Sequence, residues 1–153
     1  MATAAALTVA TTNKYFNPHE DGAQWPYYLT LDWKSTDLGV VSLDIVDTYN
    51  TAVAAGAPHL PYVPLIAGRI AAVETIPGTL GIPATNPPTN AYDITLLDVY
   101  GHDVADGNLG GRSSTVAEKL VFDTPVPIGG ELTLTIANAG DAKNGRIIIT
   151  MVY

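Results

Sequence analysis

Apolar and polar residues alternate along short stretches of this chain, and the alternation predicts β-strands. It is clearest at residues 131–137, Glu-Leu-Thr-Leu-Thr-Ile-Ala, where apolar and polar side chains take turns. A period of two places one set of side chains on a buried face and the other on a solvated face. Runs of branched and aromatic residues predict further strands at 29–33, 40–46, 68–75, 92–99, 119–122 and 145–153. Around residues 115–120, a short helix is an alternative to the strand.

Turn-forming residues separate these runs. The chain has 14 glycines and 11 prolines, which is typical of short strands joined by turns and too many for a helical protein. Three prolines within 58–64 exclude both helix and central strand, whereas 49–57 fits either one or two helical turns or an irregular loop. Pro125 and Pro127 mark an edge. We therefore expect an all-β fold of seven or eight strands: a single antiparallel β-sandwich (jelly-roll or immunoglobulin-like) or a small barrel, connected as a meander or Greek key.

The N-terminal segment differs from the rest of the chain. Residues 1–14 are rich in Ala and Thr and weakly patterned, and half of the twelve aromatic residues follow at 15–33. We expect an extended arm over 1–28, followed by a β-sandwich domain over 29–153. The aromatic residues either form a first strand and fill the core or bind a neighbouring subunit, since buried aromatic side chains dominate interface energetics. The candidate interface residues are Tyr15, Phe16, Trp25, Tyr27 and Tyr28.

The charge of the chain narrows the class of partner. Seven basic residues against 15 acidic ones give a net charge of −8, which argues against nucleic acid and against an anionic membrane. Charged residues make up only 14% of the chain, so the chain either has a small solvent-facing surface or hides part of its surface against partners. No run reaches the length of a membrane helix and no signal peptide is recognised, so we expect synthesis in the cytoplasm. The absence of cysteine excludes disulfides, thiolate catalysis and cysteine-based zinc sites.

Residues capable of catalytic chemistry are scattered. The histidines, His19, His59 and His102, form no pair at helical spacing, so the chain has no helical metal motif. His102 and Asp103 would form a triad with a serine, but no G-x-S-x-G turn supplies the nucleophile. The carboxylate pair Asp44 and Asp47 could suggest acid–base chemistry, but it is interpreted as solvated charges at the edge and end of the strand at 40–46. We therefore expect no enzymatic activity and assign no catalytic residue.

A glycine-rich stretch with acidic side chains suggests a calcium site. Asp98, Asp103, Asp106 and Asn108 offer oxygen ligands, but their spacing fits no EF-hand loop and a bidentate Glu is missing. Asx side chains at turns usually bind the local backbone, and this interpretation is favoured. The glycines within 107–111 lack the Lys-Ser/Thr pair of a phosphate loop. The sequence therefore assigns neither a metal site nor a cofactor.

Several segments of the C-terminal half carry a family resemblance. They are Gly-Arg-Ile-Ala-Ala-Val-Glu-Thr at 68–75, Pro-Thr-Asn-Ala-Tyr-Asp-Ile-Thr-Leu-Leu-Asp at 88–98, Gly-His-Asp-Val at 101–104 and Gly-Asn-Leu-Gly-Gly-Arg-Ser at 107–113. Gly-Glu-Leu-Thr-Leu-Thr-Ile-Ala-Asn-Ala-Gly at 130–140, followed by Lys-Asn-Gly and an aliphatic strand, belongs with them. Together these segments resemble a family of small structural proteins of tailed bacteriophages.

The resemblance implies a non-enzymatic virion protein and, within that class, a capsid decoration (cement) protein. Such a protein binds the major capsid protein at the capsid exterior and stabilises the shell, as a homo-oligomer for which a trimer is favoured. The first alternative is another virion component: tail, head–tail connector or fibre base. The second is a carbohydrate-binding β-sandwich, which exposed and coplanar Trp25 and Trp33 would favour. The third is a hydrolase whose site converges only in three dimensions.

Overall fold

The computed structural model describes residues 6–12, 27–35, 41–45, 69–78, 86–128 and 132–152, with the backbone alone for 6–12, Tyr27 and 41–45. The described residues form strands and contain no helix that could cross a membrane. The strands are β1 (Ala6–Thr12), β2 (Tyr27–Lys34), β3 (Val41–Ile45), β4 (Arg69–Pro77), β5 (Asp93–Leu97), β6 (Glu118–Pro127), β7 (Leu132–Ala137) and β8 (Asn144–Val152).

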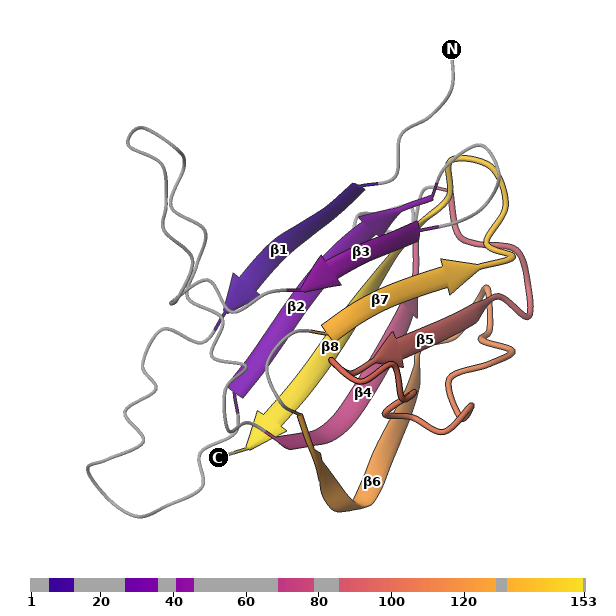
Figure 1. Cartoon of the computed structure of the whole chain (residues 1–153). Coiled ribbons are helices and arrows are strands. Elements are labelled where there is room, and N and C mark those ends of the chain that lie inside the picture. The colour runs from indigo at the N-terminus through magenta and orange to yellow at the C-terminus, as the bar shows by residue number, and fades with distance from the viewer. Residues whose placement is uncertain are drawn as a thin grey trace, which may run out of the picture.

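The strands build two antiparallel sheets, one in front of the other (Figure 1). The larger sheet has the order β1-β2-β8-β4-β6 and the smaller one the order β3-β7-β5. The predicted all-β antiparallel sandwich is therefore confirmed. Among the described strands, only β1 and β2 are neighbours both in sequence and in a sheet, so the connectivity is not a meander.

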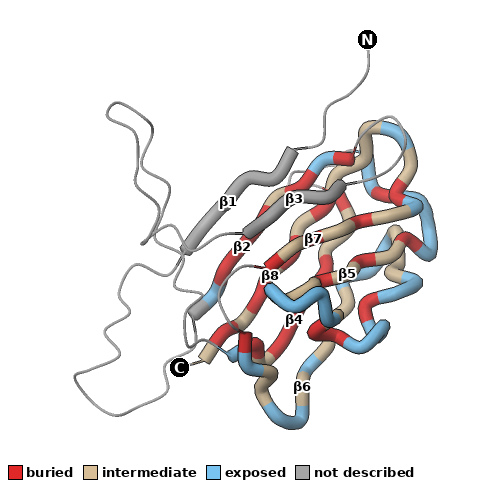
Figure 2. Tube along the Cα trace, in the orientation of Figure 1, coloured by how far each residue is buried: buried red, intermediate tan, exposed pale blue. Residues whose placement is uncertain are grey.

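The core lies between the sheets, and the period-two pattern explains which side chains enter it. Along β7 buried and partly exposed residues alternate, with Leu132, Leu134 and Ile136 turned inward. Strand β8 is apolar on both faces in sequence, yet its burial also alternates, so that Ile148 lies on the outer face. The red segments in Figure 2 follow this alternation in both sheets. The core side chains are completed by Leu29, Leu31, Trp33, Ile70, Val73, Ile94, Leu96, Ile147, Ile149 and Met151.

Strand β6 is an edge strand, as Pro125 and Pro127 predicted. The sequence alternative of a helix at 115–120 is not realised, because residues from Glu118 onward pair with β4. The register jumps from the pair Ala72–Val121 to the pair Ile70–Val126, so β6 has a large bulge between its two halves. A bulge and two residues without N–H groups both discourage pairing at this edge.

The N-terminal segment contributes a strand that the sequence did not predict. Residues 6–12, placed by sequence within the arm, form β1 and pair antiparallel with β2, from Ala6 opposite Lys34 to Thr12 opposite Leu29. The sheet therefore begins earlier in the chain than the predicted boundary at residue 29. The rest of the predicted arm before Tyr27, and the segment 46–68, lie outside the described residues.

Candidate functional site

The segment from Asp98 to Arg112, here called the β5 loop, runs back along the outer edge of β5. Isolated bridges join Tyr92 to Arg112 and Leu97 to Asp103. Between these two bridges, backbone hydrogen bonds also join β5 to the loop. The Ile94 N–H donates to the Leu109 carbonyl at 3.0 Å, and the Val104 N–H donates to the Leu96 carbonyl at 2.8 Å. The loop thus satisfies the backbone groups of an edge strand, one of the ways in which proteins protect sheet edges.

Side chains of the β5 loop also enter the core. Leu109 is fully buried, and Val104 and Ala105 are buried beside it. The sequence analysis treated this stretch as a glycine-rich excursion and missed its role. The available signal was the recurrence of apolar residues after the turn at Gly101, in a stretch otherwise made of polar residues and glycine: Val104, Ala105 and Leu109.

The acidic side chains of the loop bind its own backbone, which confirms the turn interpretation for Asp98 and Asp103. Asp98 Oδ1 accepts hydrogen bonds from the Tyr100 and His102 N–H groups, each at 2.9 Å. Asp103 Oδ1 accepts from Ala105 N–H at 3.1 Å and from Leu96 N–H at 3.4 Å, while Oδ2 accepts from Gly107 N–H at 2.8 Å. Within the described ranges, no group of three His, Asp or Glu side chains is placed to hold a metal ion.

Asp103→Asn is expected to lower the free energy of unfolding by about 2 kcal/mol. The amide nitrogen would replace one carboxylate oxygen and face a backbone N–H, and the remaining hydrogen bonds would lose their charge. Denaturant unfolding measures the change. Asp106→Asn is the matched control, because it removes the same charge from an exposed residue of the same loop at a positive φ of 49°, which Asn tolerates. Equal stability of both variants would contradict the role assigned to Asp103.

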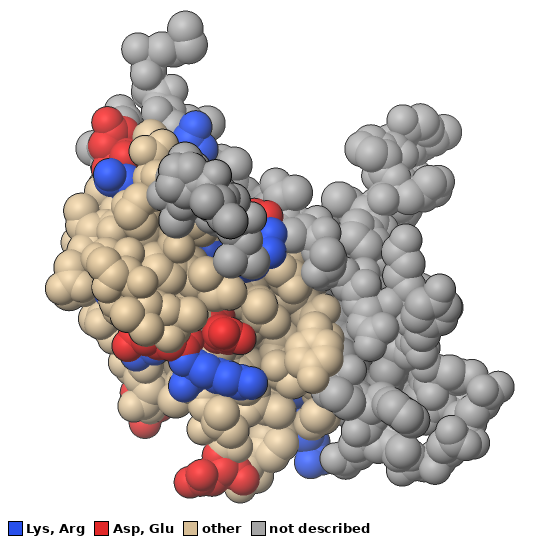
Figure 3. All heavy atoms as spheres, turned by 180° about the vertical axis from the view of Figure 1, so that it is seen from behind, with Lys and Arg blue, Asp and Glu red and all other residues tan. Residues whose placement is uncertain are grey.

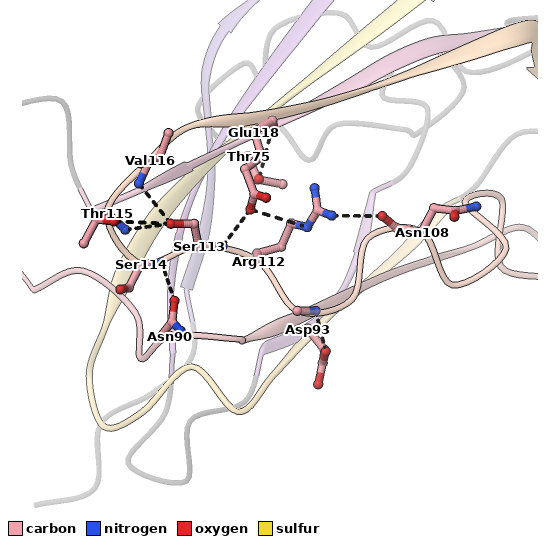
Figure 4. A network of polar contacts seen from close by, with 11 residues as sticks. Thr75, Asn90, Asp93, Asn108, Arg112, Ser113, Ser114, Thr115, Val116 and Glu118 are labelled. Atoms are coloured by element: carbon pink, nitrogen blue, oxygen red, sulfur yellow. Dashed lines mark hydrogen bonds and ion pairs between the residues drawn. The ribbon is translucent and has the colours of Figure 1, made fainter.

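A polar network joins the end of the β5 loop to β6 (Figure 4). Arg112 Nη2 donates to the Asn108 carbonyl at 3.1 Å, and its Nε lies 3.8 Å from Glu118 Oε2. Glu118 Oε2 also accepts from the Ser113 N–H at 2.6 Å. The Ser113 hydroxyl accepts from the N–H groups of Thr115 and Val116. These contacts fix the connection between the two sheets.

Asp93, the first residue of β5, connects the start of this strand to the end of the β5 loop and to the residue that follows β7. Its Oδ1 accepts from the Gly111 N–H at 2.9 Å, and its Oδ2 accepts from the Asn138 side-chain amide at 2.8 Å. These hydrogen bonds stabilise the charged form, and they hold the pKa of the Asp93 carboxyl below its usual value. Asp93 is thus a structural residue at the end of the sandwich.

Tyr92 is fully buried at the inner end of this polar network. Its ring lies 5.9 Å from the Trp33 ring, centroid to centroid, and its hydroxyl has no hydrogen-bond partner among the described residues. Burial raises the pKa of Tyr92 to about 12, with the nearby Thr75 hydroxyl offsetting part of the effect. A phenol in such surroundings is strongly held in its neutral form.

The candidate interface residues can be placed only in part. Tyr28 is 45% exposed and projects from β2 on the outer face of the larger sheet. Tyr27 belongs to β2 with its backbone alone described, and Tyr15, Phe16 and Trp25 lie outside the described residues. Trp33 is only 3% exposed, which weakens the carbohydrate-binding alternative because a buried ring cannot stack on a sugar.

The outer face of the larger sheet is seen from behind in Figure 3, where some acidic and basic side chains lie next to one another and others stand apart on an uncharged surface. Arg146 forms a bidentate pair with Asp32 across β2 and β8, with distances of 2.6 and 2.9 Å. Glu74 of β4 stands directly opposite Lys119 of β6. Two pairs of opposite charges therefore lie across neighbouring strands of this face.

The histidine-based alternatives find no support in the described part of the chain. His102 is exposed and its Nδ1 lies 3.5 Å from Asp98 Oδ2, while the neighbouring Asp103 is occupied by backbone N–H groups. His19, His59 and Asp47 lie outside the described residues, and for Asp44 only the backbone in β3 is described.

Two exposed apolar residues that the sequence analysis did not select stand at the tip of the β5 loop. Val99 is 52% exposed and Tyr100 is 79% exposed, next to each other in the chain. The signal available in the sequence was an aromatic residue directly before a turn glycine, which reads equally well as a strand end.

Comparison with protein-family models, with curated proteins and with solved structures found no match to this chain.

Proposed function

We propose that this chain is a bacteriophage capsid decoration protein, which binds the major capsid protein on the exterior of the virion and stabilises the shell through non-covalent contacts. The proposal builds on the resemblance of residues 68–153 to small structural proteins of tailed phages. The observation that carries it furthest is the exposed Tyr28 on an outer sheet face where Asp32 is paired with Arg146 and Glu74 stands opposite Lys119. Charges paired in this way can be covered by a neighbouring molecule without being left unpaired.

In this proposal the outer face of the larger sheet, on which Tyr28 lies, is the interface between copies of the chain. These copies form a homo-oligomer, for which a trimer is favoured. Tyr28, Ile148 and Val121 offer apolar surface there, and Val121 is 64% exposed at the edge strand β6. Aromatic side chains at the centre of an interface contribute most to affinity. The remaining candidate interface residues, Tyr15, Phe16 and Trp25, stay a prediction from the sequence.

Quantitative mass spectrometry of purified virus particles tests the function. A copy number equal to that of the major capsid protein, or a simple lattice fraction of it, is expected. A handful of copies per particle would assign the chain to the tail, connector or fibre base, and its absence from particles would overturn a virion role.

Tyr28→Ser is expected to weaken self-association about tenfold or more, because it removes a large exposed ring from the proposed interface. Sedimentation equilibrium measures the dissociation constant. Tyr100→Ser is the matched control, since it removes the same ring from a different surface and should leave self-association unchanged. A monomeric wild type, or equal self-association of wild type and Tyr28→Ser, would contradict this assignment of the interface.

A further inference from the structure

The tip of the β5 loop presents an aromatic side chain far into solvent. Tyr100 is 79% exposed, Val99 is 52% exposed, and the side chain of the adjacent His102 is 80% exposed. The Tyr100 and His102 rings lie 6.4 Å apart and are inclined by 38°. The Tyr100 and His102 rings therefore form one small surface beyond the end of β5. Because they face solvent, they contribute little to the stability of the fold.

The backbone beneath these side chains is held in one conformation. Asp98 acts at both ends of the turn: its carboxylate accepts from the Tyr100 and His102 N–H groups, and its carbonyl accepts from the Gly101 N–H at 3.0 Å. Its own N–H donates to the His102 carbonyl at 2.9 Å. Gly101 has a φ of +81°, which glycine adopts readily. A tip ordered before binding loses little conformational entropy when a partner covers it.

The tip stands on an acidic part of the molecule. Asp98, Asp103 and Asp106 lie within the loop, and its one arginine, Arg112, is largely buried and directed toward Glu118. A second copy of the chain would bring the same acidic loop and few basic side chains, since the chain has seven basic residues against 15 acidic ones. Like charges brought together oppose binding, so charge complementarity favours a different protein with a basic surface.

The geometry points to residues 98–102 as a docking tip for a heterologous protein partner, in which Tyr100 enters an apolar pocket rimmed by lysine or arginine side chains. The inference rests on the proposed function, under which the partner surface belongs to the capsid shell. It adds a division of labour to that function: the β5 loop binds the shell, while the outer face carrying Tyr28 binds other copies of the chain.

The test compares the wild type with Tyr100→Ser, Tyr100→Phe and Tyr28→Ser in binding to purified virus particles assembled without this chain. We expect Tyr100→Ser to lower the affinity about tenfold to a hundredfold, and Tyr100→Phe to retain most of it because the ring remains. For Tyr28→Ser we expect the affinity of each bound copy to stay near that of the wild type. Binding of the wild type should weaken as salt is raised, because the basic rim is screened.

Two results would overturn the inference, and they can be told apart. If the wild type binds particles and Tyr100→Ser binds equally well, the tip is not the docking element, while the proposed function stands. If the wild type does not bind particles at all, the proposed function fails and the shell-docking role of the tip fails with it. Thermal unfolding of each variant establishes that the exposed substitutions leave the fold intact.

Discussion

Gly145→Ala is expected to lower the free energy of unfolding by about 3 kcal/mol, because the new methyl group has no room. Gly145 lies in β8, directly opposite Trp33 of β2. A Cβ atom at this position would lie 2.5 Å from Trp33 Cε2 and 2.7 Å from Nε1, far inside van der Waals contact. The indole is only 3% exposed and packs against the core, so it cannot move away without disturbing its neighbours. Thermal unfolding should show a midpoint lower by about 10 °C.

Two comparisons isolate the clash between Gly145 and Trp33. Gly110→Ala places a methyl group 3.4 Å from Asp93 Oδ1 and from the Gly107 carbonyl oxygen, so it should cost less than about 1 kcal/mol. In a Trp33→Leu background the indole is gone, and Gly145→Ala should then cost much less than in the wild type, which a double-mutant cycle measures. A full cost of Gly145→Ala in that background would show that the clash is not its cause.

Raising the pH from 10 to 12 is expected to destabilise the wild type by about 2 kcal/mol more than Tyr92→Phe. The pKa of Tyr92 is raised from 10.0 to about 12 in the folded protein. Well below pH 10 the phenol is protonated in both the folded and the unfolded protein, so its contribution to the free energy of unfolding does not change with pH. Between pH 10 and 12 the unfolded chain loses this proton while the folded protein retains it, and unfolding becomes easier. A difference of about two units between the two pKa values corresponds to about 3 kcal/mol over the whole titration, of which about 2 kcal/mol falls between pH 10 and 12.

Denaturant unfolding at several pH values tests this expectation. At neutral pH, Tyr92→Phe should change the stability by less than about 1 kcal/mol, because the hydroxyl it removes has no hydrogen-bond partner among the described residues. Tyr100→Phe, which removes a hydroxyl from an exposed ring, is the control for the loss of a tyrosine. Parallel pH profiles for the wild type and Tyr92→Phe would contradict the preference of Tyr92 for its neutral form.

Local patterns were sufficient to predict most of the strands. The alternation at 131–137 became β7, the apolar run at 145–153 became β8, and Pro125 and Pro127 correctly marked β6 as an edge. Each of these features is set by residues close together in the sequence, because a strand's period and a proline's missing N–H are local properties. The favoured interpretation of Asp98 as a turn residue rested on the same kind of evidence.

Features that depend on distant residues were not predictable. Strand β1 has a weak pattern of its own and forms by pairing with β2. The contact between Gly145 and Trp33 joins residues more than a hundred positions apart, and no local sequence pattern around either residue predicts it. The edge-covering role of the β5 loop likewise depends on Leu109 meeting the backbone of Ile94. The exposure of Tyr100 follows from the position of the turn in the folded molecule.

The two flanks of the sandwich differ in how readily each can pair with a further strand, in the way that a polymer-forming monomer can have one reactive end or two. On one flank, the outer groups of β5 are occupied by the β5 loop, and β6 is interrupted by its bulge and its prolines. On the other flank, β1 and β3 are the last strands of their sheets among the described residues. A molecule that accepts a further strand at both flanks is bifunctional and grows into fibres. With one flank closed, the chain behaves as a monofunctional unit, so any strand addition ends after a single step.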